Sequence, residues 1–169
     1  AKVRRALEQA GVTSGSRVVL DKLAFAGEVR SLAGPMRGAG TFSIGDAPYI
    51  YRISTSRFGA DGIKLKLGID TSERPLTIEA DGMFALERGA PRFEGNLALT
   101  RPVGSALASG KAAINEPWRA TSKVKATSAG VMFDQVEFQY GPEERVMNLT
   151  GTAEVKLGAQ PRLQGLFSA

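Results

Sequence analysis

The stretch GIKLKLGID, residues 62–70, decides the fold class. Ile63, Leu65, Leu67 and Ile69 alternate with two lysines and a glycine, so every second side chain is apolar. A period of two residues places successive side chains on opposite faces of a β-strand, whereas a helix needs a period of about 3.6. The stretch therefore predicts a half-buried antiparallel strand with one apolar face.

The same alternation returns along much of the chain. Short turn sequences rich in glycine, proline and acidic residues separate the alternating runs. Several short strands joined by tight turns indicate an all-β fold, mainly an antiparallel meander. The further runs are 48–54, 75–80, 92–100, 135–140 and 152–157.

Two segments depart from this alternation. KVRRALEQAG (2–11) has apolar side chains at helical spacing and a glycine at its end, which predicts one short N-terminal helix. RPVGSALASGKAAINEP (101–117) has little patterning and bounding prolines, so we expect a loop or insertion there, with one turn of helix within 105–113 as the alternative. Because the chain opens without an initiator Met, residues 1–169 are expected to be a single β-rich module excised from a larger protein.

Composition removes most catalytic chemistries. The 169 residues include no His and no Cys, so an imidazole base, a thiolate nucleophile and a thiolate metal site are excluded. The 22 basic residues give a net charge of +5 but are spread along the chain, without the basic patch and stacking aromatics of a nucleic-acid binder. We therefore expect no catalysis, metal, cofactor or nucleic-acid partner.

A similar sequence pattern occurs in three parts of the chain. The stretches 40–53, 82–99 and 151–169 each contain an alternating strand, a turn with Gly and Pro, and a second strand. This predicts an irregularly spaced hairpin repeat in one continuous sheet, although β-meanders also converge on such turns without true repetition. Gly82 and Gly151 follow apolar runs without a break, so we interpret them as bulges or bends inside one long, curving strand.

The C-terminal third resembles segments of bacterial AsmA family proteins. The stretch PWRATSKVKATSAGVMFDQVEFQYGPEERVMNLTGTAEVKLGAQPRLQGLFSA (117–169) has a Trp-led strand, a V-x-F-x-Y-G strand, L-T-G-T-A and a closing P-R-L-x-G-x-L/F-S-A. The stretch 40–86 is similar in style, and LFSA (166–169) is a small departure from the pattern. The resemblance rests on patterned strands, without a catalytic fingerprint. Trp118, followed by Arg119, is expected to open a strand and to anchor the edge of the sheet.

The resemblance implies a large envelope protein of Gram-negative bacteria, anchored in the inner membrane and working in the periplasm. In that family a long, strongly curved or rolled β-sheet forms a groove lined with apolar side chains. The groove is proposed to conduct lipids between the inner and outer membranes and to support outer-membrane assembly. The implied partners are phospholipid or another acyl-chain lipid and the flanking repeats of the same protein, with the membrane anchor outside this chain.

What covers the apolar face decides between lipid binding and an ordinary core. A sheet with one apolar face must bury it against a second layer, by curling on itself, or against a ligand. We predict a trough for acyl chains. The alternatives are a sandwich in which the same stripe is packed core, and a structural or protein-interaction module that binds through its sheet edges. The side chains predicted to face lipid are Ile63, Leu65, Leu67, Leu76, Ile78, Phe84, Leu86, Phe93, Leu97, Leu99, Val136, Phe138, Val155 and Leu157.

Overall fold

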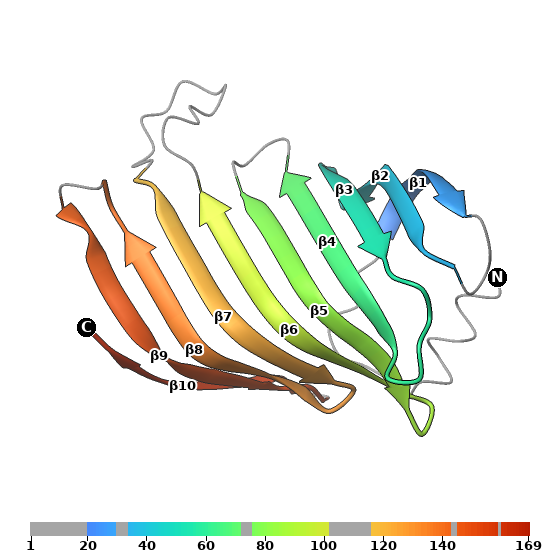
Figure 1. Ribbon diagram of the computed structural model, residues 1–169. Coiled ribbons are helices and arrows are strands. Elements are labelled where there is room, and N and C mark those ends of the chain that lie inside the picture. Colours follow the sequence, from blue (N-terminus) through green and yellow to red (C-terminus); the bar gives the residue numbers. More distant parts are fainter. Residues whose placement is uncertain (1–19, 30–33, 72–75, 102–115, 143–144, 159) are drawn as a thin grey trace.

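The computed structural model describes residues 20–29, 34–71, 76–101, 116–142, 145–158 and 160–169, which form one ten-stranded sheet (Figure 1). Each strand pairs antiparallel with the next strand along the chain, which confirms the predicted all-β meander. The predicted N-terminal helix and nearly all of the predicted loop at 101–117 lie outside the described residues. The strands are β1 (Leu20–Val29), β2 (Met36–Ile44), β3 (Ala47–Thr55), β4 (Ile63–Thr71), β5 (Thr77–Glu87), β6 (Ala90–Arg101), β7 (Trp118–Thr127), β8 (Gly130–Tyr140), β9 (Met147–Lys156) and β10 (Arg162–Ser168).

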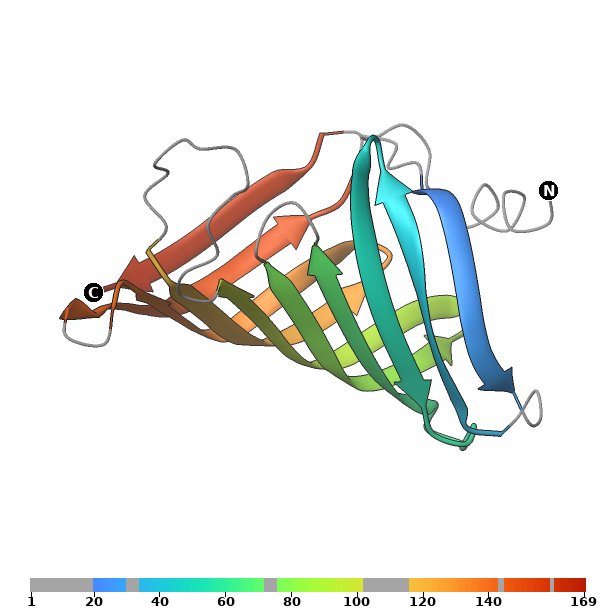
Figure 2. The same cartoon turned by 90° about the horizontal axis from the view of Figure 1, so that it is seen from above.

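The sheet is open and forms a single layer. β1 and β10 form its two edges, and seen from above they remain apart (Figure 2). Within the described part of the chain, strands contact only their immediate neighbours in the sheet order, so no strand packs face to face on another. The sheet is twisted but neither closed nor strongly curled, in contrast to the rolled form that the resemblance implies.

Tight turns explain why the chain forms a meander. The turn between β5 and β6 consists of Arg88 and Gly89, both at positive φ (52° and 83°), between the paired residues Glu87 and Ala90. Two left-handed residues are the signature of a type I′ hairpin, whose twist matches that of the strands. The β2–β3 turn has Gly45 at φ 60°. All three stretches of the predicted repeat form hairpins, namely β2–β3, β5–β6 and β9–β10.

Bulges in β1 and β8 shift the phase of the side-chain alternation. In β1 the pairing with β2 shifts beside Lys22, which has φ 53°. In β8 the pairing with β9 shifts between Phe133 and Val136, next to Gln135 at φ 52°. Each bulge absorbs one extra residue, and this keeps apolar side chains on the same face before and after it.

The glycines predicted as bulges lie inside single strands. Gly82 lies within β5 in unbroken register with β4 and β6, so the bulge interpretation is wrong there. Gly151 lies within β9, opposite the bulge of β8, and its own pairing with β10 is unbroken. Gly82 pairs directly with Gly95 of β6, which brings two residues without side chains together near the middle of the sheet.

Candidate functional site

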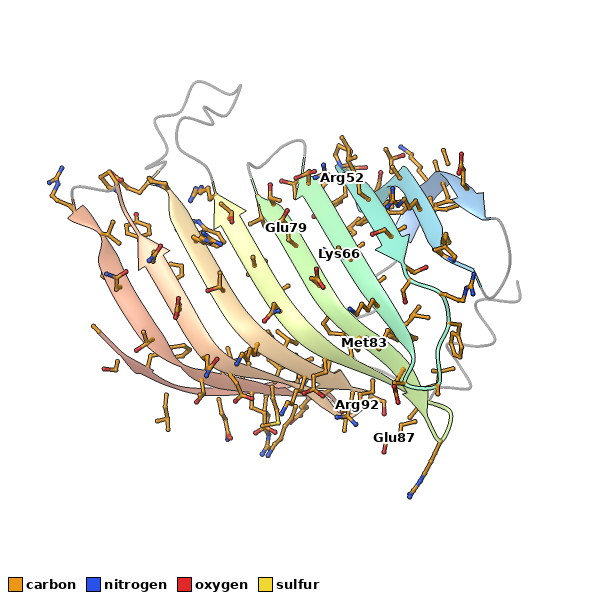
Figure 3. The ribbon with its side chains drawn as sticks, in the orientation of Figure 1. Arg52, Lys66, Glu79, Met83, Glu87 and Arg92 are labelled. Atoms are coloured by element: carbon orange, nitrogen blue, oxygen red, sulfur yellow. The ribbon has the colours of Figure 1, made fainter. Side chains whose placement is uncertain are left out.

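Strand alternation gives the sheet two chemically different faces. The charged face carries Arg52, Lys66 and Glu79, which share one side of the sheet (Figure 3). The apolar face lies on the opposite side and is defined by rows of paired residues that cross the strands. These rows are Ile63–Phe84–Phe93–Ala126–Val131–Val155–Leu163, Leu65–Gly82–Gly95–Val124–Phe133–Ala153–Gly165, Gly38–Ile53–Leu67–Ala80–Leu97–Ser122 and Gly40–Tyr51–Ile69–Ile78–Leu99–Ala120–Phe138–Leu149.

The predicted lipid-facing residues come together on the apolar face. Each predicted residue that lies within a strand is on the apolar face. This includes Leu86, which pairs with Pro91, and Val136, which pairs with Gly151. Leu76 and Leu157 lie just outside the ends of β5 and β9. The structure thus joins residues from five strands into one continuous surface.

No protein layer of the described residues covers this surface. Val124, 6% exposed, is the only buried hydrophobic side chain among them, and none is fully shielded from solvent. The apolar face therefore remains accessible along the strands.

Aromatic rings cover several glycines of the apolar face. The ring of Phe25 lies over Gly27 and Gly38, and the ring of Phe167 lies over Gly151 and Gly165, so that a side chain at any of these glycines would collide with the ring. Placing an aromatic ring over a glycine shields the backbone and fixes the register of edge strands. These contacts secure the two outer pairs of strands.

The apolar face has an aromatic cluster at one end of the strands. Phe42 and Tyr49 stack with ring centroids 5.0 Å apart, and the Tyr51 hydroxyl donates a hydrogen bond to the carbonyl oxygen of Ala24 at 2.9 Å. We call this end of the sheet the Tyr/Trp end. The strands β2, β6 and β8 end there, and β3 and β7 begin there. All three tyrosines and the single tryptophan of the chain lie on the apolar face within its last rows.

A second aromatic group lies at the same end of the apolar face, where Trp118 opens β7, as predicted. Its ring centroid lies 5.9 Å from that of Phe138, which in turn lies 6.4 Å from that of Tyr140. Because β7 lies between β6 and β8 in the interior of the sheet, the prediction that Trp118 anchors a sheet edge is wrong. Trp118 instead lies at the first residue of an interior strand.

The charged face is held by cross-strand ion pairs. Lys66 donates to Asp81 at 2.8 Å, and this hydrogen bond raises the pKa of Lys66. Arg92 binds Glu94 of its own strand at 2.9 Å and Glu87 of the adjacent strand β5 at 3.3 Å, and these partners raise the pKa of Arg92. Exposed ion pairs contribute little free energy, but oppositely charged partners on adjacent strands favour one register over its alternatives.

A broad open hollow of about 1130 Å³ lies on the charged face, which differs from the apolar groove that we expected to find. Its lining runs from β1 to β8 and contains both cations, such as Arg52 and Lys66, and anions, such as Glu79 and Asp81. The charges nearly balance, so the hollow does not define a site for one ion. The described residues also contain no cluster of acidic side chains suited to hold a metal ion.

The structure adds residues that the sequence did not reveal. Val131 and Phe133 belong to the apolar face, but the bulge at Gln135 puts them out of phase with the alternation that follows. Arg101 ends β6 on the apolar face, paired with Trp118, although the sequence placed it in a loop. Continuing the alternation of β6 beyond Leu99 by one step would have found it.

The chain has no recognisable relative in the comparisons. No family model matches it, and neither a curated protein nor a solved structure is significantly similar to it. In the part of the chain that the structure describes, no helix is long and apolar enough to cross a membrane.

Proposed function

We propose that this chain is a non-catalytic, lipid-binding module of an AsmA-like envelope protein. Acyl chains of phospholipid, or of another lipid, lie on the apolar face. The observation that carries the proposal is the accessible apolar face itself, which spans the sheet and which no other described part of the protein covers. Exposed apolar surfaces of this extent mark interaction sites or aggregation hazards.

The physical gain comes from keeping methylene groups out of water. Each one transferred to an apolar surface contributes about 0.8 kcal/mol, so a lipid can leave a bilayer for this face at little net cost. The apolar side chains of β6 run from Phe93 to Leu99, which at about 3.4 Å per residue spans roughly 20 Å. One leaflet of a bilayer core is about 15 Å thick, so an extended acyl chain fits along the strands.

The resemblance supplies the cellular setting of the proposal. The parent protein would be anchored in the inner membrane, and this module would work in the periplasm, where it conducts lipid between the membranes and supports outer-membrane assembly. A rolled groove needs more curvature than this sheet has. Flanking repeats of the same protein would supply it by adding strands to β1 and β10.

Native mass spectrometry of the chain after incubation with bacterial phospholipid tests lipid binding. We expect bound phospholipid on the wild type and its loss in Phe93→Asp, because the carboxylate would lie among the acyl chains. Met83→Asp is the matched control, since Met83 lies in an adjacent strand on the charged face, between Lys64 and Glu94. Loss of lipid in both variants, or in neither, contradicts the proposal.

The exposed edge at β10 favours a second candidate, a protein-interaction module. All seven residues of β10 are exposed, with Leu163 73% and Leu166 81% accessible. A free strand edge offers unpaired backbone groups to another chain. If this is the function, the lipid-free chain should associate in sedimentation experiments, and Leu166→Lys should reduce the association. A wild-type chain that stays monomeric at all concentrations argues against it.

A further inference from the structure

We propose that a phospholipid binds the apolar face in one direction, with its phosphate at the Tyr/Trp end beside Arg101 and its acyl chains extending toward the opposite end. This inference rests on the proposed lipid-binding function of the face. It adds that the face is polarised along the strands and that its ligand carries an anionic headgroup.

Arg101 provides the charge complementarity. Among the described residues of β2 to β10, it is the only charged residue that strand pairing places on the apolar face. Its side chain is half-buried, and it forms no ion pair within the described residues. A guanidinium group binds phosphate oxygens through paired hydrogen bonds, so this position suits a phosphate at the margin of an apolar surface.

The aromatic residues near Arg101 mark the same boundary. Arg101 pairs with Trp118, which pairs with Tyr140, so a cation and two amphipathic rings stand in one row. Tyr and Trp prefer positions where an apolar environment meets water, because each ring has an apolar body and a polar atom. This row is therefore suited to the zone between lipid headgroup and acyl chain.

Within the described strands, the opposite end of the apolar face has no such residues. Its outermost complete row runs from Ile63 through Phe84 and Phe93 to Val155 and Leu163, with only apolar side chains. The eight-residue step along β6 from Phe93 to Arg101 spans about 27 Å. Along this distance the surface changes from apolar side chains alone to a cation beside Trp and Tyr rings, as a phospholipid changes from chain end to phosphate.

Trp118, the single tryptophan of the chain, allows the direction to be measured. The probes are two phosphatidylglycerols, one with a nitroxide beside the headgroup and one with a nitroxide at the methyl end of an acyl chain, each loaded onto the protein as a monomeric lipid. We expect the headgroup-side nitroxide to quench Trp118 fluorescence several-fold more strongly. In the double variant Trp118→Phe/Phe93→Trp the order should reverse.

The outcomes separate this inference from the function on which it rests. Equal quenching by both probes at each position, or the same order at both positions, means that lipid binds without a fixed direction and overturns the inference alone. An absence of quenching by either probe at either position means that no lipid occupies the face and overturns the proposed function as well.

Replacing Arg101 tests the headgroup contact independently. Arg101→Gln should weaken phosphatidylglycerol binding about tenfold, the loss expected for a hydrogen bond to a charged group, and should leave the affinity for uncharged diacylglycerol unchanged. Arg119→Gln is the matched control, because Arg119 lies one residue beyond Trp118 and on the charged face. An equal loss for both lipids, or for both variants, contradicts a phosphate site at Arg101.

Discussion

At Gly82 the backbones of β5 and β6 approach more closely than a side chain would allow. A Cβ atom there would collide with the carbonyl oxygen of Glu94 and would lie 2.6 Å from the Cα of Gly95. Gly95 is equally restricted by the backbone at Asp81. Space rather than conformational freedom thus requires glycine at both positions, and the pair closes the middle of the apolar face without a protruding side chain.

Gly82→Ala should therefore destabilise the fold, because β5 and β6 must separate to admit the methyl group. Steric overpacking of this kind costs about 1–3 kcal/mol. Urea unfolding followed by circular dichroism would measure the change. Gly68→Ala is the control, since a Cβ there would lie 3.7 Å from the Arg52 guanidinium, an ordinary contact. Equal unfolding midpoints for the two variants would rule out the close approach at Gly82.

The ion pair between Lys66 and Asp81 predicts a pH dependence. The pKa of Lys66 is raised above its ordinary value of 10.5 by the hydrogen bond to Asp81. The stabilisation is therefore fully present below pH 10.5 and is lost as the pH rises through the folded-state pKa. The difference in urea midpoint between wild type and Lys66→Met should stay constant at neutral pH and shrink in strong alkali.

Lys64→Met serves as the comparison for this titration, because Lys64 lies on the same face of β4 and pairs across the sheet with Met83 instead of an acid. Its substitution removes a lysine from the same face without removing the ion pair between Lys66 and Asp81. A Lys66→Met difference that persists unchanged above the folded-state pKa would show that the ion pair does not stabilise the sheet.

At the scale of strands, bulges decide which elements the sequence reveals. β4 and β6 alternate without interruption, and the runs 62–70 and 92–100 predicted both of them. β8 was predicted only from residue 135, because Gln135 shifts the phase between its two halves. β1 was not predicted at all, since the bulge at Lys22 breaks its alternation. A pattern of period two cannot detect a strand whose phase changes inside it.

The left-handed backbone of Gln135 yields a prediction for β8. At φ 52° a residue with a side chain is strained by about 1 kcal/mol relative to glycine, so Gln135→Gly should stabilise the chain by up to that amount. Gln139→Gly, in the extended part of the same strand, should destabilise it by about 0.5–1 kcal/mol. Urea unfolding measures the change in stability of each variant. A change of the same sign in both variants would show that no bulge exists at Gln135.

At the scale of the whole molecule, the sequence predicted the meander and the membership of the apolar face but not what lies against that face. Leu67 and Leu97 would alternate with polar residues in the same way in a sandwich, a rolled groove or an open sheet. Contacts between strands that are not neighbours in the sheet distinguish these three architectures, and the described residues form no such contacts. Arg101 was missed because the prediction ended the strand at Thr100, although the alternation of β6 continues one residue further, where Arg101 pairs with Trp118.

An NMR experiment on methyl-labelled protein with bound phospholipid tests most directly whether a lipid, and not protein, covers the apolar face. We predict nuclear Overhauser effects from acyl-chain methylene protons to the methyl groups of Leu67 and Leu97, and none to Ile50, which is 46% exposed and lies on the charged face. Effects from Leu67 and Leu97 only to side chains of another protein segment would show that the face is packed core and would contradict the account.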